Sequence, residues 1–220
     1  MTDKIIITSD GSHTLHVPGM NEHFHSTGGA VRESMLVFIT NGFDHSKAEN
    51  LKILEVGFGT GLNALLTFSR SVETGRPVIY TSIEKYPLDR NTLEELNHYS
   101  YAGTNGKQYA ELIYSAQWNT ETRLNENFVL NKVNDDFLSC QLTGGFNLIY
   151  FDAFGPDKQP EMWSQELFDK IAKATVKGGI LVTYSVKGTV KRALKASGFS
   201  VELLKGPPGK RQVLRAVKLL

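Results

Sequence analysis

The sequence predicts an α/β protein with a mostly parallel sheet and helices on both of its faces. From residue 51 onward, apolar runs bounded by turn residues alternate with segments of helical periodicity. This alternation is typical of parallel strands joined by helices. Only Lys205–Arg211 separates the last two apolar runs. That is too short for a crossover helix, so these two strands should form an antiparallel hairpin at the sheet edge.

Seven strands are expected in the second part of the chain: Leu51–Val56, Val78–Glu84, Phe128–Val133, Phe146–Phe151, Gly179–Ser185, Ser200–Lys205 and Gln212–Val217. Segments of helical period lie between most of them: Leu62–Ser69, Leu88–Leu96, Ala110–Ser115, Gln165–Val176 and Thr189–Ala196. Before residue 51 the pattern differs. Residues 5–17 read as a hairpin that turns at Asp10-Gly11, and residues 30–39 carry apolar side chains at helical spacing.

The composition bounds the class of protein. The chain has 220 residues, of which 40% are hydrophobic and 21% are charged, and these values exclude a disordered or fibrous chain. We expect residues 1–45 to form an amino-terminal hairpin, lid and helix segment, and residues 46–220 to form one compact unit. No apolar run has the roughly 18 residues of a membrane span, and no signal peptide is evident. The single Cys140 fits a reducing compartment, so we expect a cytoplasmic protein.

A glycine-rich segment, Leu54–Asn63, follows the first strand of the large sheet and opens a helix. Its spacing is Gly57-x-Gly59-x-Gly61, preceded by an acidic residue. A dinucleotide-binding fingerprint would need its third glycine at position 62, which is Leu62. The segment instead resembles the loop that binds S-adenosylmethionine. An ordinary glycine-rich turn between a strand and a helix is the alternative.

Acidic residues follow two further strands. Glu84 ends the second strand of the sheet, where a carboxylate can accept hydrogen bonds from both ribose hydroxyls of a nucleoside. The alternative is a surface ion pair with Lys85 or Arg90. Asp135, in Asn134-Asp135-Asp136, is a candidate contact to an adenine amino group, although such clusters usually form turns.

The most specific signal is the block from Tyr150 to Trp163. Asp152 ends a very apolar strand and is followed by aromatic residues and prolines. This strand should adjoin the strand before the glycine-rich loop, so Asp152 should face the reactive end of a ligand. A helix cap at an ordinary turn is the alternative, but it leaves the clustering of Phe154 and Trp163 unexplained.

These segments together resemble a family of methyltransferases that complete 5-methylaminomethyl-(2-thio)uridine at the tRNA wobble position. Members occur alone (MnmD-like) or as the methyltransferase half of a bifunctional enzyme (MnmC-like). The segments that carry the resemblance are Glu55–Asn63, Glu84–Leu88, Phe151–Phe168, Lys205-Gly206 and Gly209–Arg211, with His25–Ser34 matching less closely. The resemblance spans nearly the whole chain and is weakest over residues 98–130.

The resemblance implies a class I, Rossmann-like methyltransferase fold and an enzyme that methylates the amine of 5-aminomethyl-(2-thio)uridine. The methyl donor would be S-adenosyl-L-methionine and the product S-adenosylhomocysteine. Because the chain stops at Leu220, we expect no flavin oxidase half, and we expect no metal. The expected cofactor-binding residues are Glu33, Glu55, Gly57, Gly59, Gly61, Asn63, Glu84, Lys85, Asp135 and Asp152.

Asp152 is the expected catalytic residue, since a carboxylate can orient the amine and receive a proton. Phe154 and Trp163 could stack against an everted uracil, and core packing is the alternative for Trp163. His23 and His25 lack partners of the metal-site type and are expected in a polar lid.

Charge is distributed unevenly along the chain. Residues 151–220 hold 13 Lys and Arg against 6 Asp and Glu, whereas the first 150 residues have a net charge of −6. We expect the basic third to hold the anticodon region of tRNA. The expected contacts are Lys187, Lys191, Arg192, Lys210 and Arg211. The alternative is that these charges only solvate the surface. No membrane and no obligate protein partner are expected.

Three other functions remain as alternatives. An aminopropyltransferase of the spermidine synthase type shares the sheet, but it would favour an acidic pocket and gives no reason for the basic third. A nicotinamide dehydrogenase conflicts with the missing third glycine. A non-catalytic RNA-binding module gives no reason for Glu55, Glu84 and Asp152 to occur together.

Overall fold

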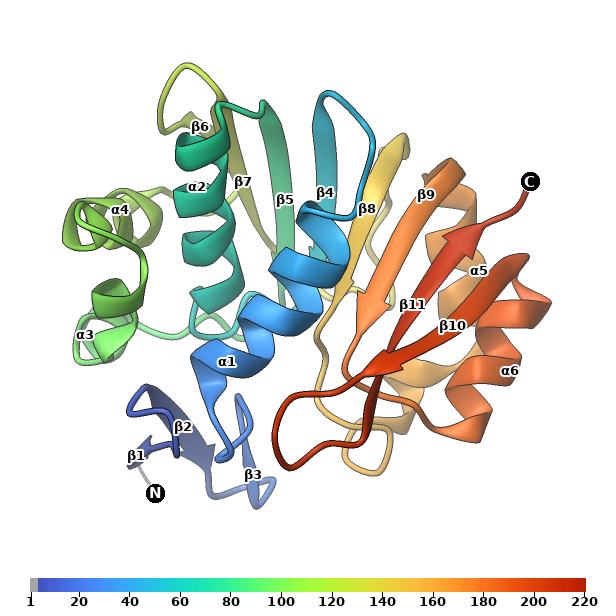
Figure 1. Cartoon of the computed structure of the whole chain (residues 1–220), viewed down its shortest axis with the longest axis horizontal. Coiled ribbons are helices and arrows are strands. Elements are labelled where there is room, and N and C mark those ends of the chain that lie inside the picture. The colour runs from blue at the N-terminus through green and yellow to red at the C-terminus, as the bar shows by residue number, and fades with distance from the viewer. Residues whose placement is uncertain (1–3) are drawn as a thin grey trace.

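A computed structural model describes residues 4–220, and residues 1–3 of the expected amino-terminal segment lie outside that description. The molecule is organised around an eight-stranded sheet with the order β10-β11-β9-β8-β4-β5-β7-β6 (Figure 1). The strands are β4 (Leu51–Val56), β5 (Val78–Glu84), β6 (Thr120–Arg123), β7 (Phe128–Asn134), β8 (Phe146–Phe151), β9 (Thr175–Thr183), β10 (Phe199–Lys205) and β11 (Gln212–Lys218).

The pairing confirms the predicted α/β class. Strands β9, β8, β4, β5 and β7 are parallel, and β8 lies directly beside β4 as expected. The hairpin of β10 and β11 closes one edge, with β11 antiparallel to β9. The other edge is β6, antiparallel to β7, which we did not predict. Its sequence, Thr-Glu-Thr-Arg, has no apolar residue, because a short edge strand need not bury a face.

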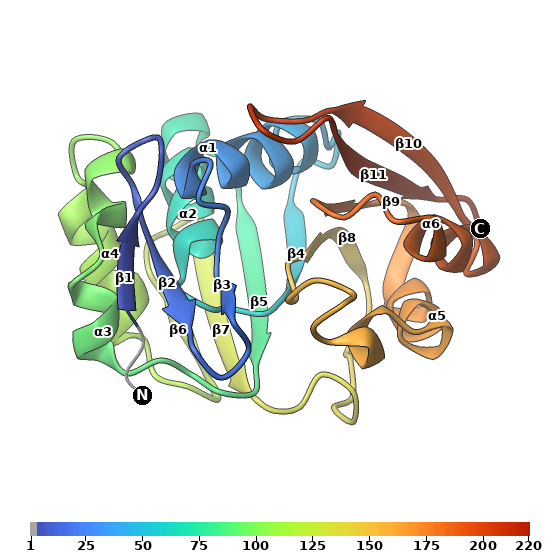
Figure 2. The ribbon, with the colours of Figure 1, turned by 90° about the horizontal axis from the view of Figure 1, so that it is seen from below.

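Helices cover both faces of the sheet (Figure 2). They are α1 (Ala30–Ser34), η1 (Met35–Phe43), α2 (Leu62–Thr74), α3 (Arg90–Glu94), η2 (Asn97–Tyr101), α4 (Gly106–Ser115), η3 (Pro160–Trp163), α5 (Gln165–Ala174) and α6 (Gly188–Ala196). Successive strand residues point to opposite faces. Ile53 of β4 therefore packs with Phe38 and Phe68 of η1 and α2, whereas Leu54 packs with Phe168 of α5.

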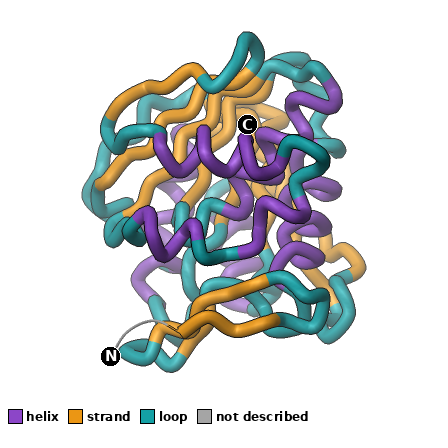
Figure 3. Tube along the Cα trace, turned by 90° about the vertical axis from the view of Figure 1, so that its left-hand side faces the viewer, coloured by secondary structure: helices purple, strands orange, loops and turns teal. Residues whose placement is uncertain are grey.

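The amino-terminal segment forms a separate small sheet followed by a helix that reaches the large sheet (Figure 3). Its strands are β1 (Lys4–Ile7), β2 (His13–Val17) and β3 (Glu22–His23), so the predicted hairpin is confirmed and a two-residue strand is added. The helix predicted over residues 30–39 is present as α1 followed directly by the π-helical η1, which extends to Phe43. A side chain at Gly42 would lie 3.1 Å from Tyr150, so glycine lets η1 pack closely on the sheet.

None of the helices within residues 4–220 combines the length and apolar character needed to cross a membrane.

Candidate functional site

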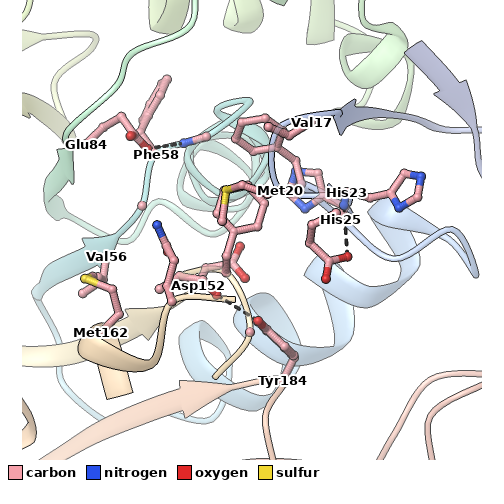
Figure 4. Close-up of a pocket in the computed structure, with 18 of the residues that line it drawn as sticks. Val17, Met20, His23, His25, Val56, Phe58, Glu84, Asp152, Met162 and Tyr184 are labelled. Carbon is pink, nitrogen blue, oxygen red and sulfur yellow. Dashed lines mark hydrogen bonds between the residues drawn. The ribbon is translucent and has the colours of Figure 1, made fainter. Parts of the chain in front are cut away.

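A cavity of about 750 Å³ opens beyond the carboxyl ends of β4, β5 and β8. The amino-terminal segment and the loop between β10 and β11 complete its wall (Figure 4). Ligands of open parallel sheets bind at this edge. Of the expected site residues, the cavity wall includes Glu33, Gly57, Gly59, Glu84, Lys85, Asp152, Phe154 and Lys210.

The glycine-rich loop forms the part of the wall nearest to β4. Gly57, Gly59 and Gly61 have φ angles of 89°, 52° and 72°, a region that favours glycine. A side chain at Gly57 would lie 3.3 Å from the backbone oxygen of Asp152, so glycine brings the two strand ends together. Gly61 precedes the first residue of α2 and lies outside the cavity wall described by the structure.

Glu84 is bound to the glycine-rich loop through its carboxylate. Its Oε2 accepts a hydrogen bond from the backbone N–H of Gly59 at 3.1 Å, and its Oε1 accepts one from Tyr86 at 2.8 Å (Figure 4). Lys85 instead pairs with Asp136 at 2.8 Å, and Arg90 pairs with Glu94 and Glu111. The alternative of a surface ion pair for Glu84 is therefore wrong, and its carboxylate stands at the cavity wall.

Four of the ten expected cofactor-binding residues lie off the cavity wall: Glu55, Gly61, Asn63 and Asp135. Glu55 is fully buried and accepts a hydrogen bond from the Ser82 hydroxyl at 2.5 Å. Burial raises the pKa of Glu55 to about 8, so its carboxyl group is largely protonated at neutral pH. Asp135 does not line the cavity, although the next two residues, Asp136 and Phe137, do.

Asp152 reaches the cavity from the end of β8. Its Oδ2 accepts a hydrogen bond from the Asn63 side-chain amide at 2.7 Å. Asn63 is buried at the start of α2, so the helix after the glycine-rich loop orients this carboxyl group. Burial raises the pKa of Asp152 to about 8; the negative charge of Glu33 adds to this rise, and Lys210 opposes it.

The two expected aromatic contacts occupy different environments. Phe154 lines the cavity, and its ring centre is 5.2 Å from that of Phe24. Trp163 is buried, and its indole N–H donates to the backbone oxygen of Phe154 at 2.8 Å. Its ring packs edge-on against Phe151 in the core. The position of Trp163 thus agrees with the alternative of core packing. From the core, its hydrogen bond holds the backbone at Phe154 in place.

Tyr184 is a wall residue that the sequence did not indicate. Tyr184 follows β9, and its hydroxyl donates to the backbone oxygen of Ala153 at 2.8 Å. Lys210 forms an ion pair with Glu33, and its Nζ lies 4.5 Å from the centre of the Tyr184 ring. The sequence does contain a signal for Tyr184, because an aromatic residue directly follows β9. Only the strand order shows that β9 lies next to β8, and therefore that Tyr184 lies near Asp152.

The other four residues expected to contact tRNA lie off the cavity wall. Lys187 pairs with Asp157, and Arg211 is exposed on the same loop as Lys210. Lys191 and Arg192 lie on α6. Within residues 4–220, Lys210 is therefore the one member of the expected tRNA-binding set that the structure brings to the cavity wall.

The amino-terminal segment covers the glycine-rich loop. His25 Nε2 is 2.7 Å from the Thr60 hydroxyl, and Phe24 lies where a side chain at Gly59 would meet its ring at 3.0 Å. Burial lowers the pKa of His25 to about 3, so its ring is neutral. Across the part of the chain that the structure describes, no group of three or more His, Cys, Asp or Glu residues is arranged to hold a metal ion.

Comparisons with known proteins agree with this geometry. Residues 106–219 match the model of a family described as S-adenosyl-L-methionine-dependent methyltransferase. A protein of Aromatoleum aromaticum, named tRNA 5-methylaminomethyl-2-thiouridine biosynthesis bifunctional protein MnmC, is 32% identical over 96% of this chain and 35% of its own length. The protein of the same name from Cupriavidus necator is 32% identical over 89% of this chain and 32% of its own length. The chain thus spans about a third of these relatives.

Solved structures share the fold. The crystal structure of MnmC2 from Aquifex aeolicus has a TM-score of 0.80 and 24% identity, and the match covers 99% of this chain and 70% of that one. A spermidine synthase from Thermotoga maritima reaches only 0.53 at 11% identity, over 99% of this chain and 72% of its own. The family match, together with a class I sheet and a glycine-rich loop at the cavity, shows that this chain belongs to the S-adenosyl-L-methionine-dependent methyltransferases.

Proposed function

We propose that this methyltransferase converts 5-aminomethyl-(2-thio)uridine to 5-methylaminomethyl-(2-thio)uridine at the wobble position of tRNA. The observation that carries the proposal is Asp152, a carboxyl group at the cavity wall that Asn63 orients and burial keeps largely protonated. Such a group suits an amine acceptor, because it can hold the nitrogen and, once ionised beside a cationic ligand, take its proton. The names of the relatives supply the nucleoside.

The cavity fits S-adenosyl-L-methionine by its donor set. Side chains at Gly57 and Gly59 would meet the backbone of Asp152 and the ring of Phe24, so glycines let the loop pack closely against both parts of the cavity wall. Glu84 offers carboxylate oxygens to ribose hydroxyls, and Lys85 stands beside it. We assign Gly61, Asn63 and Glu55 to shaping the loop, Asp135 to the adenine side and Glu33 to the amino group of the cofactor.

The bound cofactor supplies an electrophilic methyl group on a sulfonium. The acceptor nitrogen must be unprotonated to attack, whereas a free alkyl amine has a pKa of about 10. The apolar wall around Phe154 disfavours the ammonium form through desolvation. Because nearby positive charge lowers the pKa of a carboxyl group, Asp152 becomes ionised beside a cationic ligand. Its carboxylate then orients the amine and accepts the proton that the nitrogen loses.

The tRNA lies, in this proposal, along the basic third, with its anticodon region at the mouth of the cavity. Lys187, Lys210 and Arg211 contact phosphates, and Phe154 stacks on the uracil, with Trp163 behind it. Phosphate contacts of this kind fix register rather than read sequence. The reaction as proposed needs no flavin, metal or obligate protein partner and takes place in the cytoplasm.

Nucleoside analysis tests the proposal. The protein is incubated with labelled S-adenosyl-L-methionine and tRNA that carries 5-aminomethyl-2-thiouridine, and the tRNA is then digested. Label in 5-methylaminomethyl-2-thiouridine is the expected result, and tRNA without the aminomethyl group is the control. Label in another nucleoside, or no label with protein that binds the cofactor, contradicts the proposed substrate.

A further inference from the structure

The ammonium group of Lys210 stands inside the cavity although its backbone belongs to a loop beyond the sheet edge. It pairs with Glu33 and lies over the face of Tyr184. The side chains of Lys210 and Glu33 are 34% and 10% exposed, so the pair is largely withdrawn from solvent. Carboxylates and aromatic faces are the groups that proteins use to bind alkylammonium ions.

The ammonium group of Lys210 also lies close to Asp152, the expected catalytic residue. Lys210 is close enough to Asp152 for its charge to lower the pKa of that carboxyl group. Tyr184 is anchored by its hydroxyl to Ala153, the residue after Asp152. The ammonium group of Lys210 therefore lies near Asp152, where the methyl donor and its acceptor must meet. Both of these ligands carry a nitrogen on a short alkyl chain: the α-amino group of the cofactor and the aminomethyl group of the nucleoside.

The loop that carries Lys210 is built as a turn separate from the sheet. The Gly206 N–H donates to the Arg211 oxygen at 3.1 Å, and the Lys210 N–H donates to the Pro207 oxygen at 2.9 Å. Gly209 has a φ angle of 89° and open space around it. Figure 1 shows the loop between β10 and β11 reaching past the sheet edge toward the small sheet. Both hydrogen bonds lie within the turn, so its shape does not depend on its position relative to Glu33.

We propose that Lys210 is a competing internal ligand: its ammonium occupies the site formed by Glu33 and Tyr184 and leaves when the alkylammonium group of a ligand binds. The cofactor version of this inference rests on membership of the family and on the assignment of Glu33 to the cofactor's amino group, whereas the acceptor version rests on the proposed substrate. In both, the loop withdraws on binding, and the affinity of the ligand is reduced by the fraction of molecules in which Lys210 holds the site.

Two nucleosides distinguish the versions by calorimetry. S-adenosylhomocysteine carries the α-amino group, and 5′-methylthioadenosine lacks the whole amino acid portion. Lys210→Met keeps the length of the stem and removes the charge. If the cofactor nitrogen takes the site, this variant binds S-adenosylhomocysteine about threefold or more tightly, with 5′-methylthioadenosine unchanged. Lys205→Met is the matched control, because it removes an exposed cation of the same hairpin outside the cavity wall.

If the acceptor nitrogen takes the site, neither nucleoside changes its affinity. Instead, Lys210→Met lowers the KM for free 5-aminomethyl-uridine, an acceptor without phosphates for the loop to contact. Unchanged affinities and an unchanged KM would overturn the proposal. Weaker binding of S-adenosylhomocysteine would also overturn it, because Lys210 would then contact the ligand's carboxylate directly.

Glu33→Gln gives a second test if Lys210→Met does not fold. It removes the anion of the site, so binding of S-adenosylhomocysteine or of the free acceptor must weaken while binding of 5′-methylthioadenosine does not. No change in either overturns the proposal. The nucleoside titrations need no tRNA, so they succeed or fail independently of whether wild-type protein methylates tRNA.

Discussion

At the residue scale, backbone contacts determine what the acidic groups of the cavity can do. Glu84 already accepts two backbone hydrogen bonds, so it both orders the glycine-rich loop and presents its remaining lone pairs to the cavity. Asp152 has one side-chain donor, Asn63, and is otherwise available to a ligand. Glu55 is buried behind the cavity wall and accepts a hydrogen bond from the Ser82 hydroxyl. Three acidic residues of one sequence pattern therefore have three different environments.

Glu84→Ala should weaken the binding of S-adenosylhomocysteine by at least tenfold. A hydrogen bond to a charged group contributes about 1.5–3 kcal/mol, and two ribose bonds are lost together with the order of the loop. Titration calorimetry measures the affinity, with Glu84→Gln as the control that keeps the shape but not the charge. Unchanged affinity in folded Glu84→Ala protein would remove Glu84 from the ribose site.

Asp152→Asn should retain the fold while turnover at saturating cofactor falls by about 10²–10⁴-fold, the usual contribution of a general acid–base group. Single-turnover methylation of tRNA measures the loss. Recovery of the rate at higher pH would assign proton acceptance to Asp152, since the amine then loses its proton to solvent. A nearly normal rate at neutral pH would show that Asp152 takes no part in the chemistry.

At the scale of elements, the turns beyond strand ends carry the candidate site. The glycine-rich loop, the segment after β8 and the β10–β11 loop meet because their strands end at the same edge of the sheet. Lys210 and Arg211 are consecutive, yet one side chain enters the cavity and the other is exposed. The same loop can therefore serve the cavity with one residue and a bound nucleic acid with the next.

Arg211→Ala should weaken tRNA binding at low salt and reduce the slope of log affinity against log salt by about 0.7–0.9, the value for one lost phosphate contact. Filter binding of tRNA over a range of salt concentrations measures the slope. Lys173→Ala, an exposed lysine of α5, is the comparison variant. If the two variants have equal slopes and affinities, Arg211 belongs to the solvated surface instead.

At the scale of the whole molecule, the cavity lies between the large sheet and the amino-terminal segment. Contacts around the cavity join these two parts. Phe24 and His25 cover the glycine-rich loop, while Glu33 pairs with Lys210 of the loop between β10 and β11. We propose that residues 1–45 act as a lid and helix segment over a methyltransferase domain formed by residues 46–220. The same enclosure desolvates Glu55 and Asp152, which links the site to the stability of the fold.

The contribution of Asp152 and Glu55 to stability without ligand should therefore fall as pH rises from about 4 to 8, whereas His25 and His98, whose pKa values burial lowers to about 3 and about 4, contribute a rise up to about pH 6.5. Asp152 has a usual pKa of 3.8 when unfolded and about 8 when folded, so the folded state binds more protons throughout this window. The stabilising contribution is complete below pH 4 and is lost as pH approaches 8. Urea unfolding at several pH values measures it. Asp152→Asn should remove its part of the fall, so the slope of stability against pH becomes more positive than in wild type, and Glu55→Gln should do the same; equal slopes in wild type and both variants would show ordinary carboxyl pKa values.

The sequence by itself determined the α/β class, the edge hairpin and most of the acidic strand ends, because each depends on local periodicity or on residues adjacent in the chain. The expected neighbouring of β4 and β8 came instead from the layout of the fold that the motifs indicated. The polar strand β6 escaped prediction because it buries no apolar face. Only the tertiary structure decided that Glu55 and Trp163 stand behind the wall while Tyr184 and Lys210 stand on it. Those positions depend on which strands become neighbours and on how deeply each side chain is buried, and both are set by contacts between residues far apart in the sequence.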